Sequence, residues 1–451
     1  MSKFDGLTRE ELLGMVLDLR QSVDVLTERV CALEAENEEL RSRLGGGGKV
    51  VPSWVKANKP ARIEKERKKR QKWFTRRRET PTEVVEHALE TCPDCGRKLG
   101  GGTEHHSRQV IEIPAAAAQV IEHQVIARYC GVCGKIYVPK LDLTGQVVGT
   151  HRVGIRLMSL VAYLSSAGRM TKRTIQSFVE AMYGVHLGLG EITKILHTVA
   201  GCGNGDRWKL LCAVRGSPYI NADETGWRED GKNGYIWTFS TSDTRYFVFR
   251  RSRSGQVAKE MIGESYEGVV VTDCYAGYNG LDGYRQVCWA HLTRDGHKLM
   301  EDNPNDADVA CWVKAVKEVY ERAKAFGSEN AKARWCARVL FEEEIHGLVE
   351  PHLGRDVPQR LLAERLEKHL SELFVFVEQP EVPSDNNGAE RALRPAVIAR
   401  KVCGGTRSEK GSETKMTLMT LFGTWKVRGL DAMDACRKLL AGESVLFPDA
   451  A

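Results

Sequence analysis

The stretch Pro-Tyr-Ile-Asn-Ala-Asp-Glu, residues 218–224, decides the fold of this chain. It is an apolar run that ends in two acids, as expected of a strand that delivers polar groups to the edge of a sheet. The turn sequence Asp-Gly-Lys-Asn-Gly, residues 230–234, predicts a hairpin into a second strand, residues 235–240. Residues 245–250 are a third β-rich run. These segments predict three consecutive antiparallel strands.

A helix and two further strands are predicted next. Residues 254–264 have a helical pattern, and Gly-Val-Val-Val-Thr-Asp, residues 268–273, is an apolar strand that stops at an acid. Residues 284–289 predict a fifth strand. Three antiparallel strands, a helix and further strands are the ribonuclease H-like order, an α/β fold in which the first and fourth strands lie side by side.

This adjacency places the carboxylates of Asp223 and Asp273 close together. Two such carboxylates repel each other unless a cation lies between them, and Mg²⁺, or Mn²⁺ in its place, prefers oxygen ligands. Two ions about 4 Å apart can activate a nucleophile and stabilise the leaving oxygen of a phosphodiester. Glu224 follows Asp223 directly, so strand alternation points it to the opposite face, in a supporting role or none.

The segment 292–382 is predicted to be a helical insertion into the strand-rich core, with Trp312, Tyr320, Trp335 and Leu340 as its own core. The pattern changes at Pro383, and a helix follows that Asp385 or Asn386 can cap.

That helix contains the third candidate acid. We expect Glu390 to face the metal ions, and Arg391 and Arg394 to bind phosphates. Further cations are expected to extend the positive surface: Arg400, Lys401, Arg407, Lys410 and Lys415.

The N-terminus contains a leucine heptad. The two seam positions are occupied by Leu12, Leu19, Leu26, Leu33 and Leu40, and by Val16, Val23, Val30, Asn37 and Leu44. Leucine at d with mostly β-branched residues at a favours a parallel dimeric coiled coil, in which Asn37 fixes the register. The alternative is a monomeric amphipathic helix packed on the body. The glycines at 45–48 end the helix and form a flexible linker.

A basic stretch, residues 56–78, contains twelve Lys or Arg against two Glu, with Trp73 and Phe74 between its clusters. Such a segment neutralises phosphates and binds DNA in a salt-dependent, sequence-tolerant way. The alternative is a solvated linker. The candidate DNA contacts are Lys68, Lys69, Arg70, Arg76, Arg77 and Arg78.

Two Cys-x-x-Cys segments follow, Cys92 with Cys95 and Cys130 with Cys133. Four thiolates at this spacing can surround one structural Zn²⁺ tetrahedrally, and two such pairs favour zinc over a redox site. The β-rich runs 108–113 and 119–129 predict a hairpin between the two segments.

Residues 151–212 have a helical pattern, with predicted helices at 171–183 and 191–199. A helix-turn-helix with Lys172 and Arg173 at the start of one helix is one interpretation. A purely structural bundle is the other, and the sequence does not separate them.

The composition is that of a globular protein, with 451 residues, 42% hydrophobic and 28% charged, which suffices for a sizeable core. No apolar run approaches the roughly 20 residues of a membrane helix. The N-terminus lacks the basic-then-apolar pattern of a secretory signal. We therefore expect a cytoplasmic protein with no membrane partner.

The residues described so far resemble the insertion sequence 66 family of bacterial DDE transposases, in the family's order and over nearly the whole chain. Asn-Ala-Asp-Glu-Thr at 221–225 and Gly-Tyr-Ile-Trp at 234–237 resemble the segment around the family's first acid. Arg-Ser-Arg-Ser-Gly at 251–255 and Thr-Asp-Cys-Tyr-Ala-Gly-Tyr at 272–278 resemble the second, and Asp-Asn-Asn-Gly-Ala-Glu-Arg-Ala-Leu-Arg at 385–394 the third.

Cys-Trp-Ala-His at 288–291 resembles a C-x-x-H element that several DDE families have before their insertion. Cys288 and His291 are candidates for a structural clip rather than for a second zinc site. The family often has Arg-Lys-Asn-Trp after the third-acid helix, whereas this chain has Arg-Lys-Val-Cys-Gly-Gly at 400–405.

The resemblance implies that Asp223, Asp273 and Glu390 bind metal and that the protein cuts DNA at element ends and joins the 3′-hydroxyls to target DNA. It also implies DNA as partner, a homodimer or higher oligomer, small accessory proteins and association with the bacterial nucleoid. The alternatives are a nuclease of the same fold, a DNA-binding regulator that has lost an acid, and an oxidoreductase using the cysteine pairs. All three acids are present, and no convincing nucleotide-binding glycine motif is found.

The expected domains are a coiled coil with its linker (1–48), a basic segment (49–80), a zinc module (81–145), a helical region (146–212), the first part of the catalytic core (213–291), the helical insertion (292–382) and the third-acid helix with the tail (383–451).

Overall fold

A computed structural model describes residues 29–30, 33, 78–114, 116–281, 283–443 and 445–447. The predicted coiled coil lies outside these residues except for Arg29, Val30 and Leu33, which are helical. Of the basic stretch 56–78, only Arg78 is described. The chain divides into two units, residues 1–111 and 112–451, and each is described by itself.

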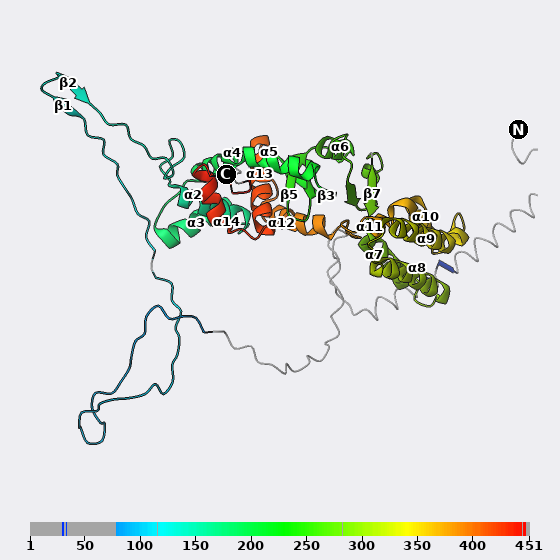
Figure 1. Ribbon diagram of the computed structural model, residues 1–451, viewed down its shortest axis with the longest axis horizontal. Helices are drawn as coiled ribbons and strands as arrows, with labels where there is room; N and C mark the ends of the chain where they lie inside the picture. Colours follow the sequence, from blue (N-terminus) through cyan, green and yellow to red (C-terminus); the bar gives the residue numbers. More distant parts are fainter. Residues whose placement is uncertain are drawn as a thin grey trace, which may run out of the picture. The chain divides into compact units, whose positions relative to one another are not determined.

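The central sheet of the second unit has the order β5-β4-β3-β6-β7 (Figure 1). Its strands are β3 (Tyr219–Glu229), β4 (Lys232–Ser240), β5 (Arg245–Arg250), β6 (Val269–Thr272) and β7 (Tyr284–Val287). Strands β3, β4 and β5 are antiparallel, and β6 is parallel to both β3 and β7. The first and fourth strands of the sheet are therefore neighbours, as the sequence predicts.

The hairpin between β3 and β4 is tighter than expected, and β3 is correspondingly longer. The turn consists of Asp230 and Gly231, whose φ angles of 51° and 73° are both positive. Two consecutive positive φ angles characterise the type I′ turn, for which Asp-Gly is a favoured sequence because its twist matches that of the strands. The pairing consequently extends to Glu229 and Lys232.

Helices α2 (Ile155–Ser166), α3 (Lys172–Tyr183), α4 (Leu189–Cys202) and α5 (Asn204–Arg215) precede the sheet, and α6 (Gln256–Ile262) lies between β5 and β6. After the insertion come α12 (Asn387–Cys403), α13 (Glu409–Val427) and α14 (Ala432–Leu440). Apolar residues of α2 to α5, α13 and α14 share one buried cluster with Ile220, Trp237 and Phe239 of the sheet. The helices before the sheet are thus packed with it in a common core.

Most buried residues of the insertion form a second cluster, which includes Val287 of β7, while Val375 and Val382 pack with Val269 and Val271 of β6. The helices of the insertion are α7 (Trp289–Asp302), α8 (Ala307–Ala325), α9 (Ala331–Val349), α10 (Arg360–Lys368) and the short α11 (Val375–Glu378), which gather beyond β7 in Figure 1. Trp289 stacks on Tyr320 with ring centres 4.6 Å apart, and Trp312 is buried nearby.

Two predicted core residues of the insertion lie at the surface instead. Trp335 is 54% exposed and Leu340 is 60% exposed. The buried row of α9 is Ala337, Ile345 and Val349, spaced at multiples of four residues, and the other two lie off that row. Their hydrophobic character predicted burial, but their position on the helix excludes it.

The two ends of the insertion lie next to each other. The backbone N–H of Trp289, at its start, donates to the carbonyl oxygen of Ser384, just beyond its end, at 3.1 Å. The hydroxyl groups of Tyr320 and Ser384 are 3.0 Å apart. About 90 residues are therefore enclosed between two hydrogen-bonded positions.

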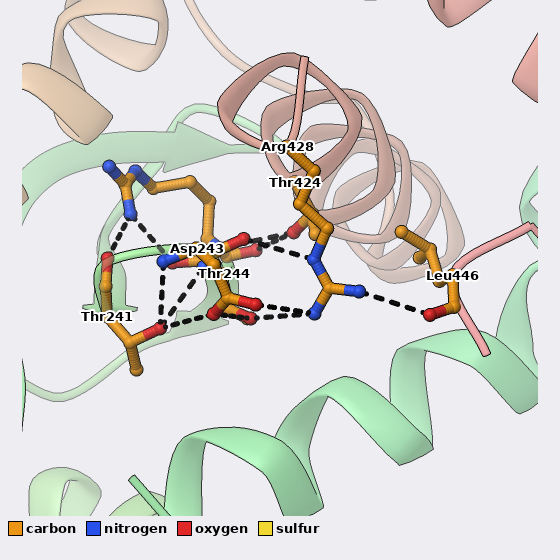
Figure 2. A network of polar contacts seen from close by, with 7 residues as sticks. Thr241, Asp243, Thr244, Thr424, Arg428 and Leu446 are labelled. Atoms are coloured by element: carbon orange, nitrogen blue, oxygen red, sulfur yellow. Dashed lines mark hydrogen bonds and ion pairs between the residues drawn. The ribbon is translucent and has the colours of Figure 1, made fainter. Parts of the chain in front are cut away.

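A polar network joins the β4–β5 turn to α13 and to the segment after α14 (Figure 2). The Arg428 guanidinium lies 3.0 Å from a carboxylate oxygen of Asp243 and donates to the carbonyl oxygen of Leu446 at 3.1 Å. Thr424 Oγ1 accepts from the backbone N–H of Arg245, the first residue of β5. This network fixes α13 against the edge strand.

The region of the cysteine pairs has less regular structure than predicted. The strands present are β1 (Arg128–Cys130) and β2 (Lys135–Tyr137), which pair around the second cysteine segment alone. The expected hairpin strands at 108–113 and 119–129 are wrong apart from the last two residues, Arg128 and Tyr129. Val110, Ile113 and Val120 are exposed, so no packed face stabilises a sheet there.

Across the described segments, no helix is both long enough and apolar enough to span a membrane.

Candidate active site

The three predicted acids come from three different elements of the second unit. Asp223 lies in β3 opposite Thr238 of β4, Asp273 directly follows β6, and Glu390 lies in the first turn of α12. Asp223 and Asp273 are half-buried, and the Glu390 side chain is 29% exposed. Parallel pairing of β3 with β6 positions the two aspartates, and α12 packs on β3.

Backbone amides orient both aspartates. One carboxylate oxygen of Asp223 accepts from the N–H of Glu224 at 2.8 Å. One carboxylate oxygen of Asp273 accepts from the N–H of Tyr275 at 2.9 Å, which closes a turn at the end of β6. Each carboxylate is thus held at a strand position by the local backbone.

Electrostatic interactions connect the acids. Burial raises the pKa of Asp223, and the negative charges of Glu224, Asp273 and Glu390 raise it further, to about 7, against the opposing effect of the Glu224 amide. Within the described ranges, no three or more of His, Cys, Asp and Glu are grouped closely enough to hold a metal ion. The charges of Asp273 and Glu390 thus act on Asp223, but the three carboxylates do not lie close enough together to form one coordination sphere.

A pair of buried asparagines joins β3 to the start of α12. The side-chain amide of Asn386 donates to the carbonyl oxygen of Ala222 at 2.7 Å, and Asn221 donates to Asn386 Oδ1 at 3.0 Å. A Cβ at Gly388 would lie 2.6 Å from Asn221 Oδ1, so only glycine allows this close approach. Of the two predicted cap residues, Asp385 rather than Asn386 accepts a hydrogen bond from the backbone N–H of Asn387, the first residue of α12.

Cys288 belongs to the same junction. Its sulfur accepts from the backbone N–H of Asn386 at 3.1 Å, and its own N–H donates to the carbonyl oxygen of Thr272 at 2.8 Å. Burial raises the pKa of the Cys288 thiol, which therefore stays protonated at neutral pH. His291 Nε2 lies 3.6 Å from a carboxylate oxygen of Glu390. Cys288 is a structural link to α12, and His291 faces the third acid.

Glu224 has a supporting role. Its side chain is 2% exposed, and it accepts from Arg253 Nε at 2.8 Å and from the Tyr278 hydroxyl at 2.6 Å. The Arg253 guanidinium lies 3.9 Å from the centre of the Tyr275 ring. Because Tyr275 also donates to Asp273, this group of side chains braces the turn that holds the second acid.

The cations after Glu390 differ in exposure. Arg391 and Arg394 are exposed on α12. Arg400 donates instead to the carbonyl oxygen of Gly226 at 2.5 Å, and burial lowers the pKa of Lys415. Arg400 is therefore bound to β3 and Lys415 is half-buried, so neither is as exposed as Lys401, Arg407 and Lys410.

The first cysteine segment forms a tight turn. The backbone amides of Cys95 and Asp94 hydrogen-bond to the Cys92 sulfur and lower the pKa of that thiol. Gly96, with φ at 72°, closes the turn by donating to the carbonyl oxygen of Cys92 at 2.9 Å.

The second segment has the same local structure. Amides of Cys133 and Val132 lower the pKa of the Cys130 thiol, and Gly134, with φ at 63°, donates to the Cys130 carbonyl oxygen at 2.9 Å. Both turns favour the thiolate, which is the form that binds zinc. Each pair therefore fits half of a four-thiolate zinc site.

Of the basic stretch, Arg78 donates to the carbonyl oxygen of Ser107 at 2.7 Å. The other predicted contacts in that stretch, Lys68, Lys69, Arg70, Arg76 and Arg77, lie outside the described residues.

Comparison with known families found two matches. A family model described as "Transposase IS66 family" matches residues 152–414, and one described as "zinc-finger binding domain of transposase IS66" matches residues 90–134. The first match includes all three acids, and the second includes all four cysteines. Because the first match covers more than half of the chain, the protein belongs to the IS66 family of transposases.

Similar curated proteins come from Sinorhizobium fredii (strain NBRC 101917 / NGR234). The uncharacterized protein y4jO is 30% identical over 149 residues, which are 33% of this chain and 45% of y4jO. The uncharacterized protein y4jD is 24% identical over 277 residues, 53% of each chain. The chain thus spans about half the length of the curated relatives that it matches.

Proposed function

We propose that this protein is a DNA transposase that cuts element ends and joins their 3′-hydroxyls to target DNA. The observation that supports this most is that Asp273 and Glu390, from two other elements, lie within electrostatic range of Asp223. We assign the sheet order β5-β4-β3-β6-β7 to a ribonuclease H-like core. Family membership supports the same assignment.

The donor set fits divalent cations. Burial and three neighbouring acids raise the pKa of Asp223, and a bound cation would stabilise its ionised carboxylate. Carboxylate oxygens are the ligands that Mg²⁺ and Mn²⁺ prefer. Asp223 and Asp273 would hold the ions, and Glu390 would complete one shell. When bound, two such ions activate the attacking oxygen and stabilise the leaving oxygen of a phosphodiester.

The remaining side chains position these groups. The amides of Glu224 and Tyr275 orient the two aspartates, and the Asn386 and Cys288 contacts hold the start of α12, the helix that contains Glu390. His291, beside Glu390, is placed to hydrogen-bond that carboxylate. Arg391 and Arg394 would bind phosphates of the DNA. This chemistry needs charge neutralisation and alignment rather than a covalent protein–DNA intermediate.

Outside the core, we propose that Cys92, Cys95, Cys130 and Cys133 bind one structural Zn²⁺, and that the basic stretch including Arg78 contacts DNA. The N-terminal heptad would pair two protomers so that two element ends are processed together. We also propose that the chain has the seven domains whose boundaries are expected from the sequence.

The test uses purified protein, Mg²⁺, DNA with the element's own ends and a target plasmid. Joined products that vanish in Asp273→Asn would support a transposase that uses these acids. Cutting without joining by the wild type would favour a nuclease, and binding with neither activity would favour a DNA-binding regulator.

A further inference from the structure

A basic cluster, Lys172, His197 and Lys410, lies where α4 packs against α3 and α13. Lys172 Nζ donates to Thr193 Oγ1 at 2.7 Å, and His197 Nδ1 lies 2.6 Å from Thr414 Oγ1. Thr193 is one turn before His197 on α4, and Lys410 is one turn before Thr414 on α13. Residues four apart share a helix face, with Cβ atoms about 5–6 Å apart, so the three basic side chains gather on one surface.

The charge of this cluster is uncompensated. Burial lowers the pKa of His197, and the positive charges of Lys410 and Lys172 lower it further. In the described part of the chain, neither lysine forms an ion pair. Glu413, which is near Lys410 in sequence, faces Arg207 at 3.8 Å. The two lysines therefore present positive charge to solvent, and a neutral His197 remains available as a hydrogen-bonding group.

The surface of α4 beside the cluster has two glycines and is accessible to a polymer. Gly190 and Gly201 lie on the same side of α4 as His197, and a Cβ at either would meet no atom within 4 Å. An extended anionic chain can thus lie over these two positions of α4 without meeting a side chain there.

The cluster is rigidly connected to the strand of the first acid. Thr406, in the loop before α13, donates from its N–H to the carbonyl oxygen of Arg228 in β3 at 2.9 Å. Arg228 is five residues beyond Asp223, which corresponds to about 17 Å along a strand. The cluster and the first acid therefore belong to one hydrogen-bonded part of the fold.

We propose that Lys172, His197 and Lys410 form a second site for the DNA backbone, which binds phosphates of the duplex whose scissile bond lies at the acids. Its ligand is the phosphodiester chain rather than base edges, because a pair of lysines and an imidazole contact phosphates without sequence information. This inference rests on the proposed function and adds a surface outside the catalytic site.

The test measures duplex binding by the full-length protein through fluorescence anisotropy at several KCl concentrations. Each lost phosphate contact reduces the slope of log K against log salt by about 0.9. Lys172→Gln with Lys410→Gln should therefore reduce the slope by roughly two. Lys172→Arg with Lys410→Arg should retain the wild-type slope. Lys298→Gln with Lys332→Gln, at exposed positions of the insertion, is the matched control and should also retain it.

An unchanged slope in the double glutamine variant would overturn the second site. A wild-type protein that does not bind duplex DNA would overturn the proposed function instead, so the two failures differ. Lysine acetylation of the wild type avoids any folding defect of the variants. DNA should protect Lys172 and Lys410 from the reagent, and equal labelling with and without DNA would contradict the inference.

Discussion

Asn386, at the start of α12, donates a hydrogen bond from its side-chain amide to the carbonyl oxygen of Ala222 at 2.7 Å. Ala222 directly precedes Asp223, so this bond connects the helix of the third acid to the strand of the first. Both residues are buried, and the bond is shielded from water.

Replacing Asn386 by Ala should therefore impair the site without touching an acid. An unpaired buried carbonyl costs about 1–3 kcal/mol, and loss of an outer contact typically lowers metal affinity or activity roughly 10- to 100-fold. Cleavage rates and the Mg²⁺ concentration for half-maximal activity would show this. Asn387→Ala, one residue further on the same helix, is the control and should behave as wild type. Equal effects of both variants would contradict the role of Asn386.

The acids themselves should be required for cutting but not for binding. Asp223→Asn, Asp273→Asn and Glu390→Gln each remove a negative charge that holds the divalent cations, and each should abolish cleavage. Duplex affinity, measured by gel shift, should stay close to that of the wild type. Glu381→Gln, an exposed acid before α12, should leave both unchanged. A variant that cuts at the wild-type rate would remove its residue from the site.

Asp223 should make stability depend on pH when divalent cations are absent. Its pKa is about 7 in the fold against an ordinary value of 3.8, so the unfolded chain ionises first as pH rises. The ionised group thus destabilises the fold, with no effect below about pH 4 and a growing loss of stability up to pH 7. Asp223→Asn should raise Tm by a few degrees at pH 8 in EDTA and leave it unchanged near pH 4.

Mg²⁺ should reverse this loss, because the ion binds the carboxylate in place of a proton. The rise in Tm on adding Mg²⁺ to the wild type should be larger at pH 8 than at pH 6, and small in Asp223→Asn. A Tm of the variant that tracks the wild type across the whole pH range would refute the raised pKa.

Zinc removal should affect the cysteine module and leave the catalytic core folded. Elemental analysis of the purified protein should find about one zinc per chain, as four thiolates bind one ion. Cys92→Ser or Cys130→Ser should lower this content and weaken binding to element ends. Cys202→Ser, at an exposed cysteine outside the two pairs, is the control. A wild-type protein without zinc would be inconsistent with the module.

The strand order and the positions of the acids could be predicted because they depend on local patterns. An apolar run such as residues 269–272 predicts a buried strand, and an acid at its end follows from the same few residues. The Asn221–Asn386 pair could not be predicted, since its members are 165 positions apart and buried amides have no periodic signal. Asn221 and Asn386 do lie in the two segments that resemble the family's acid motifs.

The insertion shows a second limit. Trp335 and Leu340 have the hydrophobicity of core residues, as Trp312 and Tyr320 do, but only the packing of α9 against its neighbours determines which face is buried. The sequence does not determine the role of Glu224, for a similar reason. Alternation places it opposite Asp223, and only the fold brings Arg253 and Tyr278 to it.

The contact between Trp289 and Ser384 has a consequence for the evolution of the chain. Because most of the insertion packs in a cluster of its own and its two ends meet at one point, we expect its helices α8 and α9 to tolerate changes in length without moving Asp273 or Glu390. Most of the insertion is thus a structurally separate unit, attached to the sheet through its two neighbouring ends and through α11.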